Sequence, residues 1–203
     1  MLKQIKPTPS ADKILNPFPP FIFKYNYDFN WPLIKDSVNE CINNTPNVSQ
    51  LEVGNSTSTL HEQARPPHEW KDKTFYDFFQ WLNIPLTEAW NAMNYQFYNK
   101  NPGYINSWFN RHQRTGQTTE HHHSYTELVV TCYLQLPKDS GFIEFRDPLE
   151  YAKSHTPIIH EKELWKEVPA VTGDILIFPG WLKHRTQANQ TDNDRIVMTV
   201  NVG

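Results

Sequence analysis

The chain has 203 residues and a formal net charge of −3, which suits one compact domain or a domain with a small extension. Hydrophobic residues make up 38% of it and aromatic residues 14%, enough for a core built on large rings. The negative net charge argues against a basic face that binds nucleic acid. Because no apolar run matches a membrane span or a signal peptide, we expect a cytoplasmic location. The two cysteines, Cys41 and Cys132, are too few for a disulfide framework or a cysteine-based zinc site.

The chain begins with a predicted arm, strand and helix. Residues 1–20 are rich in proline and are expected to lie irregularly on the surface. Large and polar residues alternate over residues 21–27, which predicts a strand. A helix is predicted over residues 31–44, because Asn30 fits its N-cap position and Pro32 its first turn.

The next part of the chain is predicted to supply a loop and more helix. Residues 45–69 are polar and rich in turn formers, so a loop is expected there. Apolar side chains then repeat at helical spacing, first Phe75, Phe78, Phe79 and Leu82, and then Leu86, Ala89, Trp90 and Met93. Because Pro85 interrupts the pattern, we expect two amphipathic helices that meet near Ile84 and pack against a core.

From about residue 104 the hydrophobic period changes from that of a helix to that of short strands. The candidate strands are residues 104–110, 121–125, 128–136, 141–145, 156–160, 166–171, 174–180 and 195–202. This pattern predicts an α+β fold, a β-sandwich or barrel braced by helices. We expect a single domain over 1–203, with the arm and supporting helices in 1–103 and the β core in 104–203.

Three consecutive histidines stand at the centre of the β-rich half. On a strand, His121 and His123 point to one face and His122 to the other. His184 follows a later apolar strand, and it can lie beside the pair if the strands close into a barrel. The triplet alone leaves open whether these residues bind a metal or form a polar loop.

Arg195 begins the last predicted strand and shares one face of it with Val197, Thr199 and Asn201. A buried arginine is costly unless it meets an anion. Its planar fork suits a carboxylate, which predicts an anion site on the inner face of the barrel.

The order of these segments resembles the 2-oxoglutarate/Fe(II)-dependent oxygenases, and most nearly a prolyl-hydroxylase-like branch of bacterial and phage proteins. The segments that carry the resemblance are SWFN, HHH, CYLQL, GFIEFRDP and FPGWLKH, over roughly residues 104–202. No single segment is specific, but their order and spacing together are. The resemblance implies a double-stranded β-helix (a jelly-roll or cupin-like core), an Fe(II) ion and 2-oxoglutarate as co-substrate.

The metal motif of the family is His-x-Asp/Glu followed by a distal histidine. By position it implies His121 and His184 as ligands, but the carboxylate position falls on His123, which departs from the pattern. We take His123 as the third ligand. The acids that remain as alternatives are Glu120, Glu127 and Asp147.

The family also implies a pocket for 2-oxoglutarate. Arg195 would bind its distal carboxylate, Tyr133 would bind the same group or serve as a core residue, and Asn110 would bond to substrate or co-substrate. The remaining isolated histidines, including His112, are expected to be surface or hydrogen-bonded residues.

The expected reaction is hydroxylation of a C–H bond with dioxygen, on a small molecule or peptide that the sequence does not name. Two alternatives stay open: a three-histidine cupin dioxygenase that does not use 2-oxoglutarate, and a non-catalytic jelly-roll binding module. We expect neither nucleic acid nor a membrane as partner.

Overall fold

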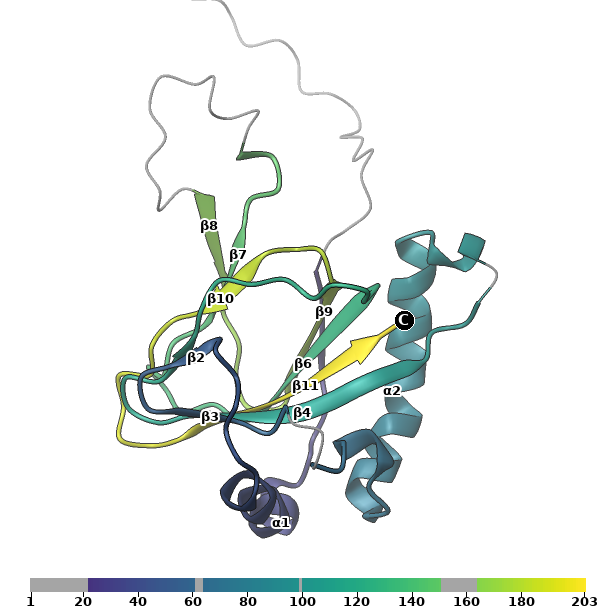
Figure 1. The fold of residues 1–203 in the computed structure, drawn as a ribbon. Coiled ribbons are helices and arrows are strands. Elements are labelled where there is room, and N and C mark those ends of the chain that lie inside the picture. Colours follow the sequence, from purple (N-terminus) through teal and green to yellow (C-terminus); the bar gives the residue numbers. More distant parts are fainter. Residues whose placement is uncertain (1–21, 61–63, 99, 151–163) are drawn as a thin grey trace, which may run out of the picture.

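The computed structural model describes residues 22–60, 64–98, 100–150 and 164–203, and has more strand than helix (Figure 1). Its elements in chain order are β1 Phe23–Asn26, α1 Trp31–Asn44, β2 Glu52–Val53, β3 Ser56–Ser58, the 3-10 helix η1 Pro67–Glu69, α2 Lys73–Ala92, the 3-10 helix η2 Tyr95–Tyr98, β4 Tyr104–His112, β5 Gln117–Thr118, β6 Leu128–Gln135, β7 Ile143–Arg146, β8 Trp165–Val168, β9 Asp174–Pro179, β10 His184–Thr186 and β11 Arg195–Val202. This confirms a fold of helices and strands. The predicted arm and the predicted strand at 156–160 lie outside the described residues.

The strands of the described residues form three sheets with antiparallel pairing. The largest has the order β1-β9-β6-β11-β4-β3, the second has the order β10-β7-β8, and β2 and β5 form a short ribbon. In the large sheet β11 lies between β4 and β6, which sets Arg195 opposite His112 and Val197 opposite Tyr133. Directly opposed residues share a face of a sheet, so these side chains lie on the same side.

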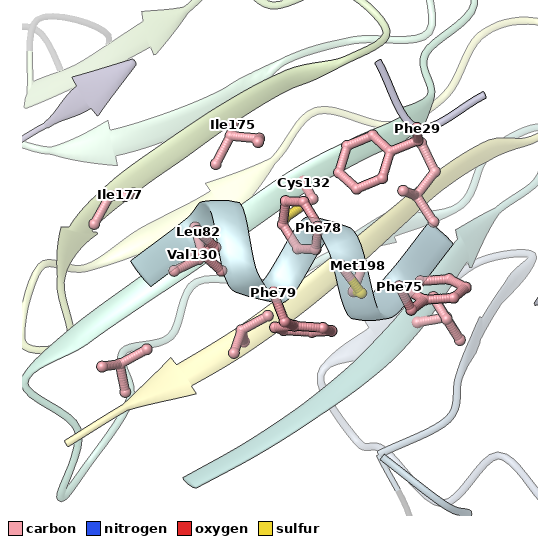
Figure 2. Packing of buried hydrophobic residues seen from close by; sticks show 14 of the residues in the cluster. Phe29, Phe75, Phe78, Phe79, Leu82, Val130, Cys132, Ile175, Ile177 and Met198 are labelled. Atoms are coloured by element: carbon pink, nitrogen blue, oxygen red, sulfur yellow. The ribbon is translucent and has the colours of Figure 1, made fainter. Parts of the chain in front are cut away.

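The large sheet separates two sets of buried side chains, because successive residues of a strand point to opposite faces. On β6, Val130 and Cys132 belong to a cluster that includes the apolar faces of α1 and α2. Figure 2 shows Phe75, Phe78 and Phe79 of α2 packed over the strands in this cluster. The opposite face carries the alternate residues and surrounds a smaller cluster and a cavity.

The predicted helix over residues 31–44 is confirmed as α1, and β1 lies within the predicted strand at 21–27. Helix α1 buries Ile34, Val38 and Ile42, which recur at four-residue spacing on one face. Asn30 occupies the N-cap position in a left-handed conformation (φ 47°), and its side chain makes no capping hydrogen bond.

The prediction of two helices meeting near Ile84 is wrong, because α2 continues through Pro85 as one helix. An interior proline costs about 3 kcal/mol. Leu82, Leu86 and Ala89 nevertheless continue a single buried stripe, and each large side chain in it contributes about 1.5–3 kcal/mol. Burial of the stripe therefore outweighs the break. No helix in the described part of the chain has the length and apolar composition that a bilayer crossing requires.

Two further predictions about local structure are wrong. Residues 45–69 include β2, β3 and η1 rather than loop alone. Residues 121–125 form no strand and make only an isolated bridge between His121 and His184. Strands of two or three residues are too short to show an apolar period, so their pairing depends on tertiary contacts.

Candidate active site

His121, His123 and His184 lie together on the cavity side of the large sheet. The main chains of His121 and His184 exchange two hydrogen bonds, each with an N–O distance of 2.9 Å. Their ring centroids are 4.2 Å apart, and the ring of His123 lies 5.1 Å from His121 and 5.2 Å from His184. One ligand atom from each residue lies within 4.8 Å of the others. The predicted grouping of these three histidines is therefore present.

A close approach of two chain segments holds His123 in place. The backbone N–H of His123 donates to Gly180 O at 2.8 Å, and the N–H of Gly180 donates to Glu127 O at 3.0 Å. A Cβ atom on Gly180 would lie 2.1 Å from Thr126 O and 3.1 Å from His123 O. Any larger residue at position 180 would push the histidine segment away from His184.

Each of the three imidazoles is oriented by a hydrogen bond at Nδ1. The acceptors are Thr119 O for His121 (2.8 Å), Leu182 O for His184 (2.8 Å) and Asn201 Oδ1 for His123 (2.7 Å). An oxygen that accepts at Nδ1 places the proton there and leaves Nε2 as a free lone pair. Nε2 of His123 is buried and has no hydrogen-bond partner among the described residues.

Burial keeps these rings neutral. It lowers the pKa of His123 to about 4, with the neighbouring His121 acting in the same direction, and it lowers the pKa of His184 well below its usual value. The pKa of His121 is lowered for the same reason, against opposing contributions from Thr119 O and Glu52. Neutral imidazole is the form that binds metals. Three converging Nε2 lone pairs, one of them buried and unpartnered, fit a divalent transition metal.

No carboxylate joins this cluster in the described part of the chain. Glu120 pairs with Arg146 at 2.9 Å and with Lys183 at 3.4 Å. Glu127 pairs with Lys100 at 2.7 Å, and Asp147 Oδ1 accepts from Leu149 N at 2.8 Å. The structure thus brings together three histidines rather than two histidines and an acid. His122 is exposed between the two inward-facing rings, on the side expected from the sequence.

A cavity of about 200 Å³ connects the histidines with Arg195. Its wall includes Asn110, Tyr133 and Thr199, which come from β4, β6 and β11. Trp108 also lines it and stacks on the ring of His123, with centroids 5.8 Å apart and planes 20° apart. The cavity therefore combines a cluster of metal-binding groups at one place with a buried cation at another.

Arg195 is 1% exposed, and its guanidinium makes four hydrogen bonds inside the protein. The acceptors are His112 Nδ1 (3.3 Å), Ser140 O (2.5 Å), Thr186 Oγ1 (3.1 Å) and Gln187 O (2.9 Å). A guanidinium has five N–H donors, so one remains for a ligand. The two-bond contact expected from the sequence would require Arg195 to give up a protein partner.

Tyr133 and Asn110 also present polar groups to the cavity. The Tyr133 hydroxyl makes no hydrogen bond to any described residue, and burial raises its pKa, so it stays protonated and can donate. Asn110 Oδ1 is buried without a partner among the described residues. Unpaired buried polar atoms are costly, which indicates a polar ligand at this position.

Three residues of the site were not predicted from the sequence. Asn201 orients His123 through a hydrogen bond. Asn201 could have been identified from the sequence, because it lies on the same face of β11 as Arg195. Glu52 and His112 lie beside Arg195 in a buried network. His112 is hydrogen-bonded as expected, but nothing in the sequence pointed to Glu52.

Solved structures share this architecture at low sequence identity. An epimerase from nogalamycin biosynthesis, SnoN, solved with Fe3+, alpha ketoglutarate and nogalamycin RO, has a TM-score of 0.58 and 12% identity, and the match covers 89% of this chain and 78% of that one. A prolyl-4-hydroxylase of Pseudomonas putida has a TM-score of 0.57 and 10% identity, with 89% of this chain and 91% of that one covered. A viral collagen prolyl hydroxylase of Paramecium Bursaria Chlorella virus-1, solved as a 2OG complex, has a TM-score of 0.56 and 10% identity, with 90% and 96% covered. At these identities the likeness concerns the fold.

A separate comparison with protein families matches part of the chain. Residues 106–201 match the model of a family described as "Putative 2OG-Fe(II) oxygenase". The match spans the segments that suggested the resemblance, from SWFN to the last strand, and it confirms the resemblance to the 2-oxoglutarate/Fe(II) oxygenases over this part of the chain. Enzymes of this family use Fe(II) and 2-oxoglutarate. The comparison with curated proteins finds no match.

Proposed function

We propose that the chain is an Fe(II)- and 2-oxoglutarate-dependent oxygenase that holds its metal with His121, His123 and His184 and hydroxylates a C–H bond of its substrate. The observation that carries the proposal is the convergence of three oriented imidazoles, with the buried Nε2 of His123 left unpartnered among the described residues. This is the arrangement of ligands that a metal with open coordination positions requires.

We also propose that the two larger sheets are the halves of a double-stranded β-helix within a single domain. Their strands lie on both sides of the cavity, and the solved structures named above support the assignment. Residues 104–203 would then form the catalytic core. Residues 1–103 would supply the arm and the helices that cover its outer face.

Iron with 2-oxoglutarate supplies the oxidising power for attack on a C–H bond, and the protein provides binding, orientation and exclusion of water. Thr119, Leu182 and Asn201 hold the three rings through Nδ1 and so fix the direction of Nε2. Arg195, with its remaining N–H, and the Tyr133 hydroxyl would bind the distal carboxylate of 2-oxoglutarate.

The substrate would enter through a groove of about 560 Å³ that shares His122, His123 and Ser124 with the cavity. Its lining includes four large aromatic side chains, those of Tyr95, Tyr98, Tyr125 and Trp181. The charged groups in the groove, Lys100 and Glu127, pair with each other at 2.7 Å. This lining favours an uncharged small molecule or peptide segment that packs against aromatic rings.

An anaerobic titration with Fe(II), with and without 2-oxoglutarate, tests the proposal. We expect iron to bind alone and a visible metal-to-ligand charge-transfer band to develop when 2-oxoglutarate is added. The His184→Ala variant should give no band, whereas His122→Ala should match the wild type.

The same titration separates the alternatives. Iron binding without any spectral response to 2-oxoglutarate would favour a three-histidine dioxygenase. The hydrogen bonds that Arg195 already makes within the protein support this alternative, because they leave one N–H free for a ligand. No iron binding, together with a thermal stability that a chelator leaves unchanged, would favour a non-catalytic binding module.

A further inference from the structure

The proposed metal site raises a problem of charge. With two histidines and one carboxylate as ligands, the net charge of a bound dication and its ligands is +1. With three neutral imidazoles it stays +2. Arg195 adds another positive charge to the same cavity. Since 2-oxoglutarate carries two negative charges, the loaded pocket would retain one uncompensated positive charge in a water-poor environment, where it is costly.

Glu52 is the one carboxylate among the described residues that line the cavity. It lies on β2, which pairs with β5 and so sets Glu52 opposite Thr118. Its side chain is 3% exposed, and Oε2 lies 2.9 Å from Nε2 of His112. Thr118 Oγ1 lies 3.0 and 3.1 Å from the two carboxylate oxygens. A carboxylate buried this deeply and paired on both oxygens is a built feature of the pocket.

The hydrogen-bond pattern determines the proton on His112. Arg195 Nε donates to His112 Nδ1 at 3.3 Å, and a guanidinium can only donate, so Nδ1 carries no proton. The proton of the neutral ring is therefore on Nε2, where it faces Glu52 Oε2. Burial lowers the pKa of His112, which keeps the ring neutral. A negative carboxylate, a neutral imidazole and a positive guanidinium thus form one buried chain.

We propose that Glu52, acting through His112, positions Arg195 and supplies the negative charge that the metal site lacks because a histidine occupies position 123. The inference rests on the proposed function. It separates two tasks that one acid performs in the usual family motif: His123 coordinates the metal, and Glu52 balances the charge.

The influence of Glu52 reaches both parts of the cavity. Burial lowers the pKa of Arg195 to about 10, and the nearby Tyr133 and Glu52 act in the opposite direction. The same carboxylate also opposes the effect of burial on the pKa of His121. A single buried charge can act on both groups because Coulomb interactions are weakly screened away from water.

Glu52→Gln tests the charge while keeping an oxygen that can accept from His112. We expect the affinity for Mn²⁺, used as a redox-stable substitute for Fe(II), to fall about tenfold, and the affinity of the Mn²⁺-loaded protein for 2-oxoglutarate to rise about tenfold, because one negative charge has been removed. Isothermal titration measures both. General damage to the pocket would weaken both ligands, so the opposite signs identify charge balance. The matched control is Glu40→Gln on an exposed turn of α1, which should change neither affinity.

His123→Asp provides a second test that does not depend on Glu52→Gln folding well. In the wild-type background it adds a negative charge, so Mn²⁺ should remain bound while the affinity for 2-oxoglutarate falls about tenfold. Combined with Glu52→Gln it recreates the usual family charge, and the double variant should bind 2-oxoglutarate about as well as the wild type. A double variant that binds 2-oxoglutarate no better than His123→Asp alone, or unchanged 2-oxoglutarate affinity in His123→Asp alone, would overturn the inference.

The wild-type titration separates this inference from the proposed function. If the wild-type protein binds neither Mn²⁺ nor 2-oxoglutarate, the proposed function fails and the inference fails with it. If the wild type binds both and Glu52→Gln behaves like Glu40→Gln, the inference alone is wrong.

Discussion

Replacing Arg195 with lysine is the most informative single change to the proposed co-substrate pocket. The substitution keeps the positive charge and removes the planar fork. Arg195 now serves four acceptors, whereas an ammonium group has three donors at one point and cannot reach acceptors spread around a guanidinium. At least two buried acceptors should lose their partner.

The magnitude follows from those contacts. Each unpaired buried acceptor costs about 1–3 kcal/mol, so Arg195→Lys should lower the free energy of unfolding by about 3 kcal/mol. For a chain of this size that corresponds to a fall in Tm of about 10 °C. Arg195→Ala would lose all four bonds, a loss comparable with the whole stability of many domains, and is therefore less suited to binding measurements.

Binding should change selectively. Because the ammonium cannot reproduce the placement of the remaining N–H, we expect 2-oxoglutarate to bind about tenfold more weakly to Arg195→Lys while Mn²⁺ affinity stays near that of the wild type. Thermal unfolding by circular dichroism and isothermal titration measure the two effects. Arg114→Lys is the control, since Arg114 is exposed and pairs with Asp192 on the surface. Wild-type Tm and wild-type 2-oxoglutarate affinity in Arg195→Lys would refute this reasoning, as would a parallel loss of metal binding.

Three further predictions concern the metal ligands. His184→Ala should abolish the increase in Tm that Mn²⁺ produces, whereas His122→Ala should keep it. If only His122→Ala loses the metal, the assignment of the ligands is wrong. Asn201→Leu removes the acceptor that orients His123, so Mn²⁺ affinity should fall about 10- to 100-fold with little change in secondary structure, and an unchanged titration would show that the bond does not orient the ring. In the metal-free protein, burial lowers the pKa of His123 to about 4, below its value near ~6.5 in the unfolded chain. The unfolded state therefore takes up the proton first, and stability should be lost as pH falls from ~6.5 towards 4, by roughly 3 kcal/mol at most from this group. Urea unfolding at several pH values measures the loss, which His123→Gln should reduce.

The β-rich half of the chain was largely predictable because its strands are long enough to show a period. On β11, the eight residues Arg195–Val202 alternate between the helix side and the cavity side. That alternation is visible in the sequence, and it correctly predicts that Arg195 and Asn201 share one face. The three histidines were found for a different reason: the order of motifs around them matched a family, although residues 121–125 do not form the strand that was predicted for them.

The first half was less predictable because tertiary contacts decide its structure. Pro85 is a strong local signal for a helix end, yet the buried stripe on both sides of it keeps α2 continuous. The ribbon of β2 and β5 has two residues in each strand and no apolar alternation. Its effect is to bring Glu52 over the cavity, and a sequence without periodicity gives no means of predicting that approach.

The proposed role of Glu52 would also explain how a motif can lose its acid and still describe a working site. Coordination requires a ligand atom in contact with the metal, so it ties a residue to one position in the motif. Charge balance does not require contact with the metal, because the electrostatic effect of a buried charge reaches groups that it does not touch. An acid at position 123 would perform both tasks at once. A histidine there would keep the coordination and would let the charge be supplied from elsewhere in the fold. The buried chain from Glu52 through His112 to Arg195 places that negative charge against the cation at the other end of the cavity.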